Sequence, residues 1–371
     1  MAQGAYPPAH SVAATVEQHF RRHNGGGPVP DAQAVERIVD AAFWASLRRD
    51  EGRAPKISLA YLPPSAAGRA LVLERRLPLD PATLTRLAPA AERPGIHLGV
   101  WSDGGEPYVW GATRTLPPFC FVLEVVQAGL LVIKHRRADP ADGGGKFGNV
   151  AVLEGDDVKV VDAQGVLSLP CPDFVSSLVA FEAPTGRRES VLLQLALSMR
   201  AHHHGGSLLV VPHGSEEWRE SILWPVMYAV APPFWGLAEL LQAVPAGRSP
   251  GGETPGFRAA IEAIGGLTAV DGATVLSDEW HVLAFGAKIG RRAGSVPVER
   301  LTLIEPIVGR PPVAVHPAEL GGTRHLSAAQ FVHEQHDALA LVASQDGQFT
   351  VFAWSESAGI VRGYRVEALL L

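Results

Sequence analysis

The stretch Gly321–Gln330, GGTRHLSAAQ, places two glycines and a threonine directly before a run with the apolar spacing of a helix. This pattern predicts a helix that begins at Thr323, whose first N–H groups have no partner inside the helix. Such an N-terminus attracts anions, and Arg324 and His325 add side-chain donors at the same place. Ser327 can cap the helix or contact the same anion. Taken alone, the segment fits an ordinary N-cap with a surface arginine equally well.

Two other segments carry polar groups at the predicted ends of strands. Asp271 stands directly before Gly272 and the strand-like run ATVL. A carboxylate at the mouth of a strand can hold a divalent cation close to phosphates, although Asp-Gly alone is mostly a turn signal. Ser344 follows the buried-strand pattern ALALVA and precedes a tight turn.

In this order, the three segments resemble the diadenylate cyclase (DAC) domain. That family carries an Asp-Gly-Ala motif, a Gly-Thr-Arg-His-Arg motif that opens a helix, and a strand ending in Ser-Glu-Glu before a glycine turn. The corresponding residues here are Asp271-Gly272-Ala273, Gly322-Thr323-Arg324-His325-Leu326 and Ser344-Gln345-Asp346-Gly347. The similarity extends over residues 187–371, where GGSLLVVPHG, HVLAFGAKI and DALALVAS are similar to strands of the family.

The resemblance implies a nucleotidyltransferase that condenses two ATP molecules into cyclic di-AMP and releases two pyrophosphates, with Mg²⁺ or Mn²⁺ as cofactor. It also implies a face-to-face homodimer or higher homo-oligomer, in which each domain holds one ATP. Asp271 would bind the metal and help to activate the 3′-hydroxyl, while Arg324 and His325 would hold the phosphates. Gly272 would let the nucleotide approach. The other nucleotide-binding residues implied by the resemblance are Ala273, Ile289, Gly322, Thr323, Ser327, Ser344 and Gln345.

Three departures from the family pattern bear on activity. Leu326 replaces an arginine, Gln345 replaces a glutamate, and Lys288-Ile289-Gly290 stands where the family often has Tyr-Leu-Pro. Losing one charge-assisted phosphate contact costs about 1.5–3 kcal/mol, which slows a reaction by about one to two orders of magnitude. The alternative function is therefore a binding module that senses ATP or a cyclic dinucleotide without turnover. The retained Asp271 favours the cyclase.

The first half of the chain is predicted to be a separate α+β domain over residues 31–180, after a loose lead-in at residues 1–30 that ends in GGGPVP. Asp31 is a predicted N-cap for the helical pattern AQAVERIVDAAFWASL, and several short strand-like runs follow. The arrangement resembles the sensor domains that precede DAC domains in some bacterial proteins. For residues 187–371, alternating helices and strands predict a central mixed sheet flanked by helices. The whole chain is thus expected to be of the α/β class, α+β overall.

Composition fits two soluble domains. Of the 371 residues, 47% are hydrophobic and 19% are charged, and the net charge is -6. This charge provides no general attraction to nucleic acid or to an anionic membrane, so neither is an expected partner. The N-terminal residues lack the pattern of a signal peptide, and a cytoplasmic location is expected. Residues 222–244 form the most membrane-like run, but Pro225, Pro232, Pro233 and Glu239 interrupt it, so we predict core.

Four other features are predicted to have no catalytic role. The segment DGGGKFGN (residues 142–149) lacks the spacing of a phosphate loop and is predicted to be a hairpin loop. The segment HEQH (residues 333–336) places its histidines three apart, whereas a zinc helix needs four. The run of residues 202–204, HHH, is explained by a helix C-terminus. Cys120 and Cys171 are expected to be reduced.

Overall fold

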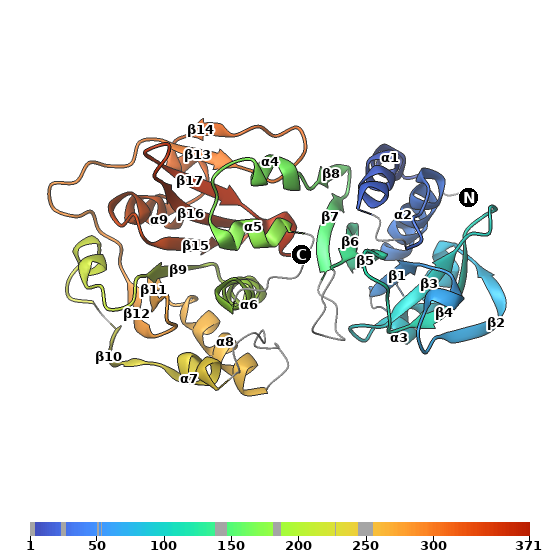
Figure 1. Cartoon of the computed structure of the whole chain (residues 1–371), viewed down its shortest axis with the longest axis horizontal. Coiled ribbons are helices and arrows are strands. Elements are labelled where there is room, and N and C mark those ends of the chain that lie inside the picture. The colour runs from blue at the N-terminus through green and yellow to red at the C-terminus, as the bar shows by residue number, and fades with distance from the viewer. Residues whose placement is uncertain are drawn as a thin grey trace. The chain divides into compact units, whose positions relative to one another are not determined.

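The computed structural model describes residues 4–23, 27–49, 52, 54–137, 147–180, 187–226, 228–243 and 255–371. The chain divides into two compact units. The first contains the described residues up to Val161 and also Leu371. The second contains Asp162–Ala180 and the described residues from 187 to Leu370. Residues 162–180, which the sequence analysis placed in the first domain, therefore pack with the second. Each unit contains one mixed sheet with helices against it, so the predicted class is confirmed (Figure 1).

The sheet of unit 1 has the strand order β2-β4-β3-β1-β5-β6-β7-β8. Strands β1 and β3 are parallel, and every other neighbouring pair is antiparallel. Strands β5 and β6 form a hairpin, in which Phe121 pairs with His135. The strands are β1 (Ile57–Tyr61), β2 (Leu71–Pro78), β3 (His97–Trp101), β4 (Tyr108–Thr113), β5 (Phe121–Gln127), β6 (Leu130–Arg136), β7 (Phe147–Glu154) and β8 (Asp157–Val160).

Three helices of unit 1 cover one face of this sheet. Helix α1 (Pro7–Arg22) packs on β7 and β8, α2 (Ala32–Ser46) on β5 and β6, and α3 (Pro81–Ala91) on β1. The predicted N-cap is confirmed, because Asp31 Oδ1 accepts a hydrogen bond of 2.7 Å from the Ala34 backbone N–H. A short 3₁₀ turn, η1 (Pro64–Ala66), precedes β2.

The expected loose lead-in at residues 1–30 was wrong for α1. Val12, Val16 and Phe20 recur every four residues and are buried in the core of unit 1. Prolines occupy the first helical positions, where a missing N–H costs nothing. The four-residue period of these apolar side chains, and not the glycines near residue 25, is the signal that identifies this helix.

The sheet of unit 2 has the order β10-β12-β11-β9-β15-β16-β17-β13-β14. Central strand β9 is buried along its whole length. Alternate residues of a strand face opposite sides, so burial of every residue means that both faces of the sheet are covered. The strands are β9 (Gly206–Val211), β10 (Tyr228–Phe234), β11 (Ala273–Ser277), β12 (Val282–Ala287), β13 (Leu301–Ile304), β14 (Val313–Val315), β15 (Leu339–Ala343), β16 (Phe349–Ser355) and β17 (Ile360–Arg365).

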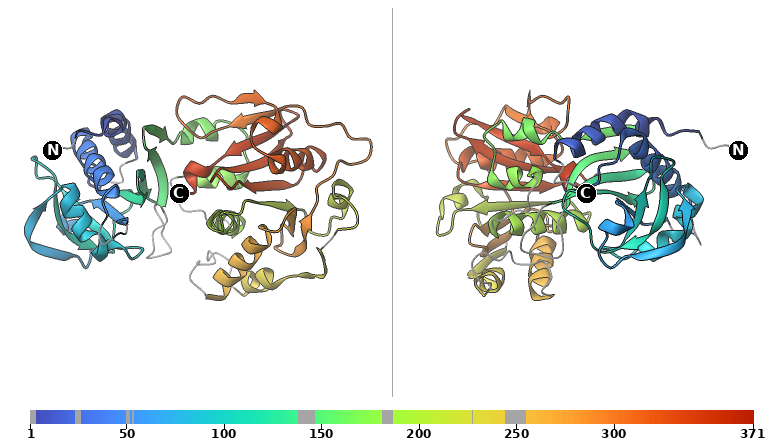
Figure 2. Two further views of the ribbon diagram at one scale, coloured as in Figure 1. Left: turned by 180° about the vertical axis from the view of Figure 1, so that it is seen from behind. Right: turned by 45° about the vertical axis from the view of Figure 1, so that its right-hand side comes forward.

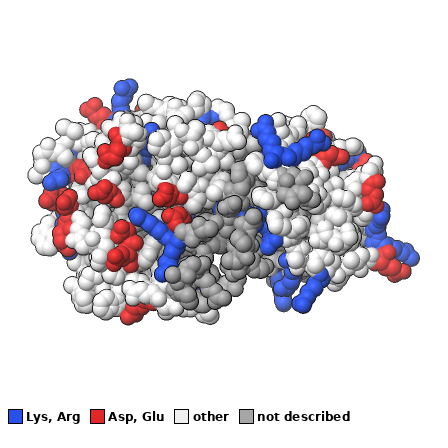
Figure 3. Space-filling model, in the orientation of Figure 1, with Lys and Arg blue, Asp and Glu red and all other residues white. Residues whose placement is uncertain are grey.

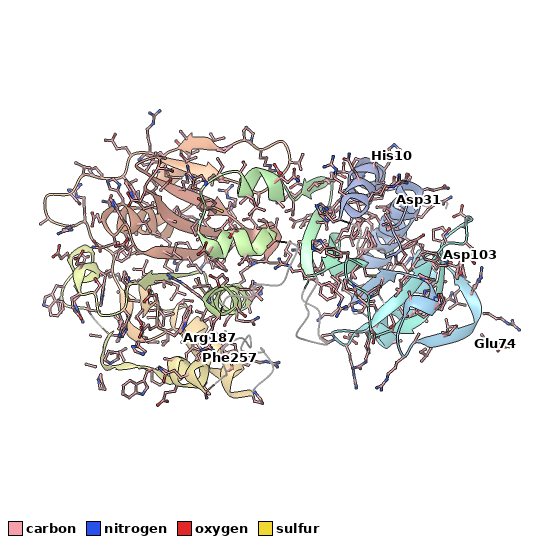
Figure 4. All side chains as sticks on the ribbon, in the orientation of Figure 1. His10, Asp31, Glu74, Asp103, Arg187 and Phe257 are labelled. Carbon is pink, nitrogen blue, oxygen red and sulfur yellow. The ribbon has the colours of Figure 1, made fainter. Side chains whose placement is uncertain are left out.

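The helices of unit 2 form the two covering layers (Figure 2). Helix α9 (Thr323–Glu334) packs on β9, β15, β16 and β17, while α6 (Arg187–Ala201) packs on β15 and on α8 (Pro255–Leu267). Figure 4 labels Arg187 and Phe257 on α6 and α8. No helix in the described ranges is long and apolar enough to cross a membrane. The remaining elements are α4 (Ala163–Leu167), α5 (Asp173–Val179), α7 (Gly236–Gln242), η2 (Glu217–Ser221), η3 (Pro317–Glu319) and η4 (Glu367–Leu369).

The prediction that residues 222–244 form core was wrong for most of that segment. β10 is an edge strand that pairs only with β12, and no residue along it is buried. The side chains of Trp224 and Trp235 are 76% and 57% exposed. Among the described residues of this segment, the buried ones are Ile222, which follows η2, and Leu237, Ala238 and Leu241 of α7. Apolar composition alone did not distinguish an edge strand from a central one.

Candidate functional site

The three motif segments meet at one edge of the unit 2 sheet. Strands β9 and β11 are parallel, with Ala273 beside Ser207, and β15 is antiparallel to β9, with Ala343 beside Gly206. The beginnings of β9 and β11 and the end of β15 therefore lie at the same edge. The residues that flank these strand ends, among them Asp271 and Ser344, are brought together there although the chain separates them widely.

Arg324 lies at this edge, next to Gly205, the residue that precedes β9. Gly205 has φ +69, and a Cβ atom on it would lie 3.0 Å from Arg324 Nη1 and 3.4 Å from Gln345 Cγ. Gln345 Nε2 donates a hydrogen bond of 3.3 Å to the His204 carbonyl oxygen. Within the described part of the chain, no carboxylate forms an ion pair with Arg324. Its guanidinium donors are thus available to an anion.

The N-terminus of α9 supplies backbone donors at the same place. Gly322 is the N-cap, and no side chain caps the helix. Thr323 is exposed at the first helical position, and Ser327 is partly buried one turn later. Uncapped N–H groups and a guanidinium at a helix N-terminus together make a positively charged anion site whose N–H donors point along the helix axis.

His325 lies in the core and not among these exposed donors. Its side chain is 1% exposed, its ring meets the Phe352 ring edge-on at 6.1 Å, and a Cβ on Gly321 would lie 2.6 Å from its Nδ1. Nε2 is buried without a hydrogen-bond partner among the described residues. Burial lowers the pKa of His325, and the charge of Arg365 acts in the same direction, so the ring is neutral near pH 7. This placement differs from the phosphate donor that the sequence indicated.

Asp271 is paired with a lysine that the sequence analysis did not assign to it. The Lys288 ammonium donates to Asp271 Oδ2, while the Asp271 side chain stays 88% exposed. This hydrogen bond and the lysine charge lower the pKa of the Asp271 carboxyl, and Arg324 acts in the same direction. Lys288 follows β12 at the point where Ala287 pairs with Ala273, so only the strand register could have revealed the contact.

Gly272 is required by the sheet itself. Its φ is +116, and a Cβ atom there would lie 2.6 Å from the Gly286 carbonyl oxygen and 2.9 Å from the Ala287 nitrogen. Real Cβ atoms do not approach backbone this closely, and L-residues rarely adopt this φ. Close approach of β12 therefore explains the glycine, whereas the resemblance had implied room for a nucleotide. Ala273 begins β11 and is buried.

Aromatic and aliphatic side chains border the same sheet edge. The Tyr228 and Phe285 rings stack with centroids 4.8 Å apart and planes 9° apart. A Cβ on Gly286 would lie 2.7 Å from Tyr228 Cδ2, so the tyrosine ring covers that glycine. Ile289 is partly buried and forms a bridge to Ile222. These residues make an apolar wall close to Asp271.

Ser344 holds a tight turn at the end of β15. The Ser344 hydroxyl donates to Asp346 and contacts the Gln348 carbonyl oxygen at 3.3 Å. The Ser344 hydrogen bond lowers the pKa of the Asp346 carboxyl. The Ser344 hydroxyl thus has partners within the turn, and a ligand would have to compete with them.

Asp271 fits a metal site completed by water and substrate phosphates, and not one made of several protein side chains. No group of three or more His, Cys, Asp or Glu side chains that could hold a metal occurs in the described ranges. Mg²⁺, however, is commonly held by one or two carboxylates together with water and substrate phosphates. Exposed Asp271 fits this arrangement, provided that the cation displaces the Lys288 ammonium.

Of the features set aside from sequence, the HHH run borders the site through the His204 carbonyl oxygen, which accepts from Gln345 Nε2, while the HEQH segment and the two cysteines lie elsewhere. His202 Nε2 contacts Thr268 Oγ1 at 3.1 Å, and the His336 ring stacks on Trp354 with centroids 3.8 Å apart. Cys120 and Cys171 are both free thiols, as expected. Of the predicted loop in residues 142–149, positions 142–146 lie outside the described residues, and the rest belong to β7.

A family model matches part of unit 1, where α2, β1, β2, α3, β3 and β4 lie. Residues 25–114 match the family described as "Probable sensor domain DACNV". The predicted sensor-like domain is confirmed over this DACNV segment. No curated protein matches the chain.

Proposed function

We propose that residues 187–371 bind ATP at the sheet edge and that two copies condense two ATP molecules into cyclic di-AMP and two pyrophosphates. One observation carries the proposal. The uncapped N-terminus of α9 and the unpaired Arg324 guanidinium face the same strand ends as the exposed Asp271 carboxylate. Phosphoryl transfer depends mainly on alignment and charge neutralisation, which these groups supply.

The proposed groups act on different parts of the two ATP molecules. Arg324 and the α9 N–H groups hold phosphate oxygens, which orients the α-phosphorus. Asp271 holds the divalent cation and helps to withdraw the proton of the attacking 3′-hydroxyl. When bound, the cation supplies further neutralisation of phosphate charge. In each half-reaction a 3′-oxygen bonds to the α-phosphorus of the other ATP, and the bond from that phosphorus to pyrophosphate breaks.

Exposed apolar groups next to the site support both a contact with the adenine ring of ATP and association of two copies of the chain. Tyr228, Phe285 and Ile289 offer an apolar wall for an adenine ring. Leu223 and Trp224 are 59% and 76% exposed, and exposed apolar patches mark interaction surfaces. A face-to-face homodimer would cover them. Figure 3 shows mostly acidic side chains over unit 2 and mostly basic ones over unit 1 on the face in view.

Two observations favour a second candidate, a nucleotide-binding module without turnover. Lys288 occupies the Asp271 carboxylate, and Leu326 stands on α9 where the DAC pattern has a cation. A lysine near phosphates strengthens binding of a nucleotide, yet it competes with the metal that turnover needs. We propose in either case that the DACNV segment modulates the output of unit 2.

Product analysis distinguishes the two candidates. The full-length protein is incubated with ATP and Mn²⁺ or Mg²⁺, and products are identified by mass spectrometry; ATP binding is measured separately by calorimetry. Asp271→Asn and Arg324→Ala are the test variants. Asp337→Asn and Arg300→Ala are matched controls, because both residues are exposed in the same unit and away from the site.

The cyclase proposal expects cyclic di-AMP from the parent and from both controls, no product from Asp271→Asn, and a loss of about ten- to hundredfold in Arg324→Ala. ATP binding that depends on Arg324, without any product, would establish the binding module instead. ATP binding that is absent, or equal in the parent and Arg324→Ala, would refute both.

A further inference from the structure

Unit 1 contains a cavity of about 310 Å³ that lies entirely inside the DACNV segment. It is bounded by strands β2, β3 and β4 and by the end of α3. No residue of the proposed nucleotide site contributes to it. A cavity of this size falls in the range of sites for small ligands.

The floor of the cavity is a strip of aliphatic side chains across three strands. Ala112 of β4 is in register with Leu71 of β2 on one side and with Leu98 of β3 on the other, so the three side chains share one face of the sheet. Leu98 is 2% exposed and Leu71 is 63% exposed. The apolar strip therefore runs from the core outward to the edge strand, where it is open to solvent.

Helix α3 and the chain that follows it form the wall. Leu87 and Ala90 of α3 and Ile96, which precedes β3, line the cavity. Ala90 is exposed, near the end of the helix, and so borders the opening. Because the floor and the wall are apolar, this lining favours an apolar chain or ring, which it would shield from water.

Two arginines stand at one end of the cavity. Arg69 precedes β2 and Arg114 follows β4; since these strands are antiparallel, both residues lie at the same end. Both are exposed, and neither forms an ion pair or hydrogen bond with a side chain in the described ranges. Two guanidinium groups without local carboxylates favour an anion between them.

Other arginines of the same unit do have carboxylate partners. Arg76 on β2 pairs with Asp103 at 2.7 Å, and Arg37 pairs with Glu106 at 2.7 Å. Figure 4 labels Asp103, together with Glu74 of β2. Asp103 and Glu106 follow β3, at the opposite end of these strands from Arg69 and Arg114, and each already pairs with another arginine. Arg69 and Arg114 are therefore left for an external charge.

We propose that the cavity binds a small amphipathic anion: an apolar chain or ring that carries a carboxylate or phosphate. The apolar part would lie on the strip that includes Leu71, Leu98 and Ala112, and the anionic head would meet Arg69 and Arg114. At ~30 Å³ for each water-sized group, the volume corresponds to on the order of ten non-hydrogen atoms. The proposal does not depend on the function of unit 2.

Calorimetry on the full-length protein tests it with decanoate, decyl phosphate and decyltrimethylammonium as probes, each below its micelle concentration. We expect saturable binding of an anionic probe to one site, with the cation bound at least about tenfold more weakly. Comparing the two anions identifies the preferred head group. Absence of saturable binding by both anions, or equal binding of the cation, would overturn the proposal.

Three variants locate the site. Ala90→Phe fills the opening from an exposed position and is expected to abolish binding. Arg114→Ala is expected to weaken it about tenfold, since it removes a charge-assisted contact. Arg86→Ala, an exposed arginine of α3 that does not line the cavity, is the control and should bind normally. Unchanged affinity in both Ala90→Phe and Arg114→Ala would contradict the assignment. So would binding to anionic phospholipid vesicles without binding of either monomeric anion, which would indicate a membrane surface.

Discussion

Replacing Gly272 by alanine distinguishes a glycine required by the sheet from one required by a ligand. The new Cβ would lie 2.6 Å from the Gly286 carbonyl oxygen, where only backbone could move away, and the residue would be held at φ +116. Strain at such a φ costs about 1–3 kcal/mol, and overpacking costs about 1–3 kcal/mol more. We therefore expect unit 2 to lose about 2–6 kcal/mol, a large fraction of a typical domain's stability.

Thermal and urea unfolding of the full-length protein measure this loss. For a domain of this size, the expected fall in the unfolding temperature of unit 2 is roughly 5–20 °C. Gly266→Ala is the matched control, because Gly266 lies in α8 and a Cβ there meets nothing within 4 Å. It should stabilise the helix by about 0.5–1 kcal/mol. A Gly272→Ala protein as stable as the parent, but weakened in ATP binding, would refute the structural reasoning and restore the ligand explanation.

Three other predictions concern charges. Lys288→Ala frees the Asp271 carboxylate and should tighten Mn²⁺ binding by up to about fivefold. Lys159→Ala, which breaks the pair of partly buried Lys159 with exposed Asp157, should leave the Mn²⁺ affinity unchanged. Equal Mn²⁺ affinities of Lys288→Ala and the parent would show that Lys288 does not compete. Leu326→Arg should raise the ATP affinity or the cyclase rate about tenfold. The control Leu240→Arg, at a similarly exposed leucine of α7, should change neither. An equal gain in both variants would indicate a nonspecific effect of the added charge. Burial lowers the pKa of His19 to about 4 and of His135 to about 3, so below pH 6.5 the unfolded chain binds protons that the folded chain does not. The stability that the two neutral histidines contribute is full above pH 6.5 and falls as the pH drops toward these pKa values. Between pH 7 and pH 5, the free energy of unfolding of unit 1, measured in urea, should therefore fall by about 2 kcal/mol per histidine. His19→Gln should remove the part of this pH dependence that comes from His19, whereas His10→Gln, at a largely exposed side chain, should leave the pH dependence unchanged. A free energy of unfolding that does not vary with pH in the parent would contradict the burial argument.

Most elements of the fold were predictable because their signals are local. The start of α9 at Thr323, the N-cap at Asp31 and the strand pairs around the glycine turns depend on residues within a few positions of one another. The errors arose where a local pattern has two structural outcomes. An apolar run such as residues 222–244 can form core or an exposed edge strand, and only its neighbours in the sheet decide which.

The candidate site divides in the same way. The sequence by itself determined which segments end strands or open a helix with polar groups, and so it identified Asp271, Arg324 and Ser344 as candidates. Tertiary structure alone decided that β9 lies between β11 and β15, which brings Gly205, Arg324 and Gln345 together, and that Lys288 reaches Asp271. It also decided that His325 is buried while Arg324 beside it is not. The physical reason is that strand register and the covering of each face are set by contacts between residues far apart in the chain, which no local pattern encodes.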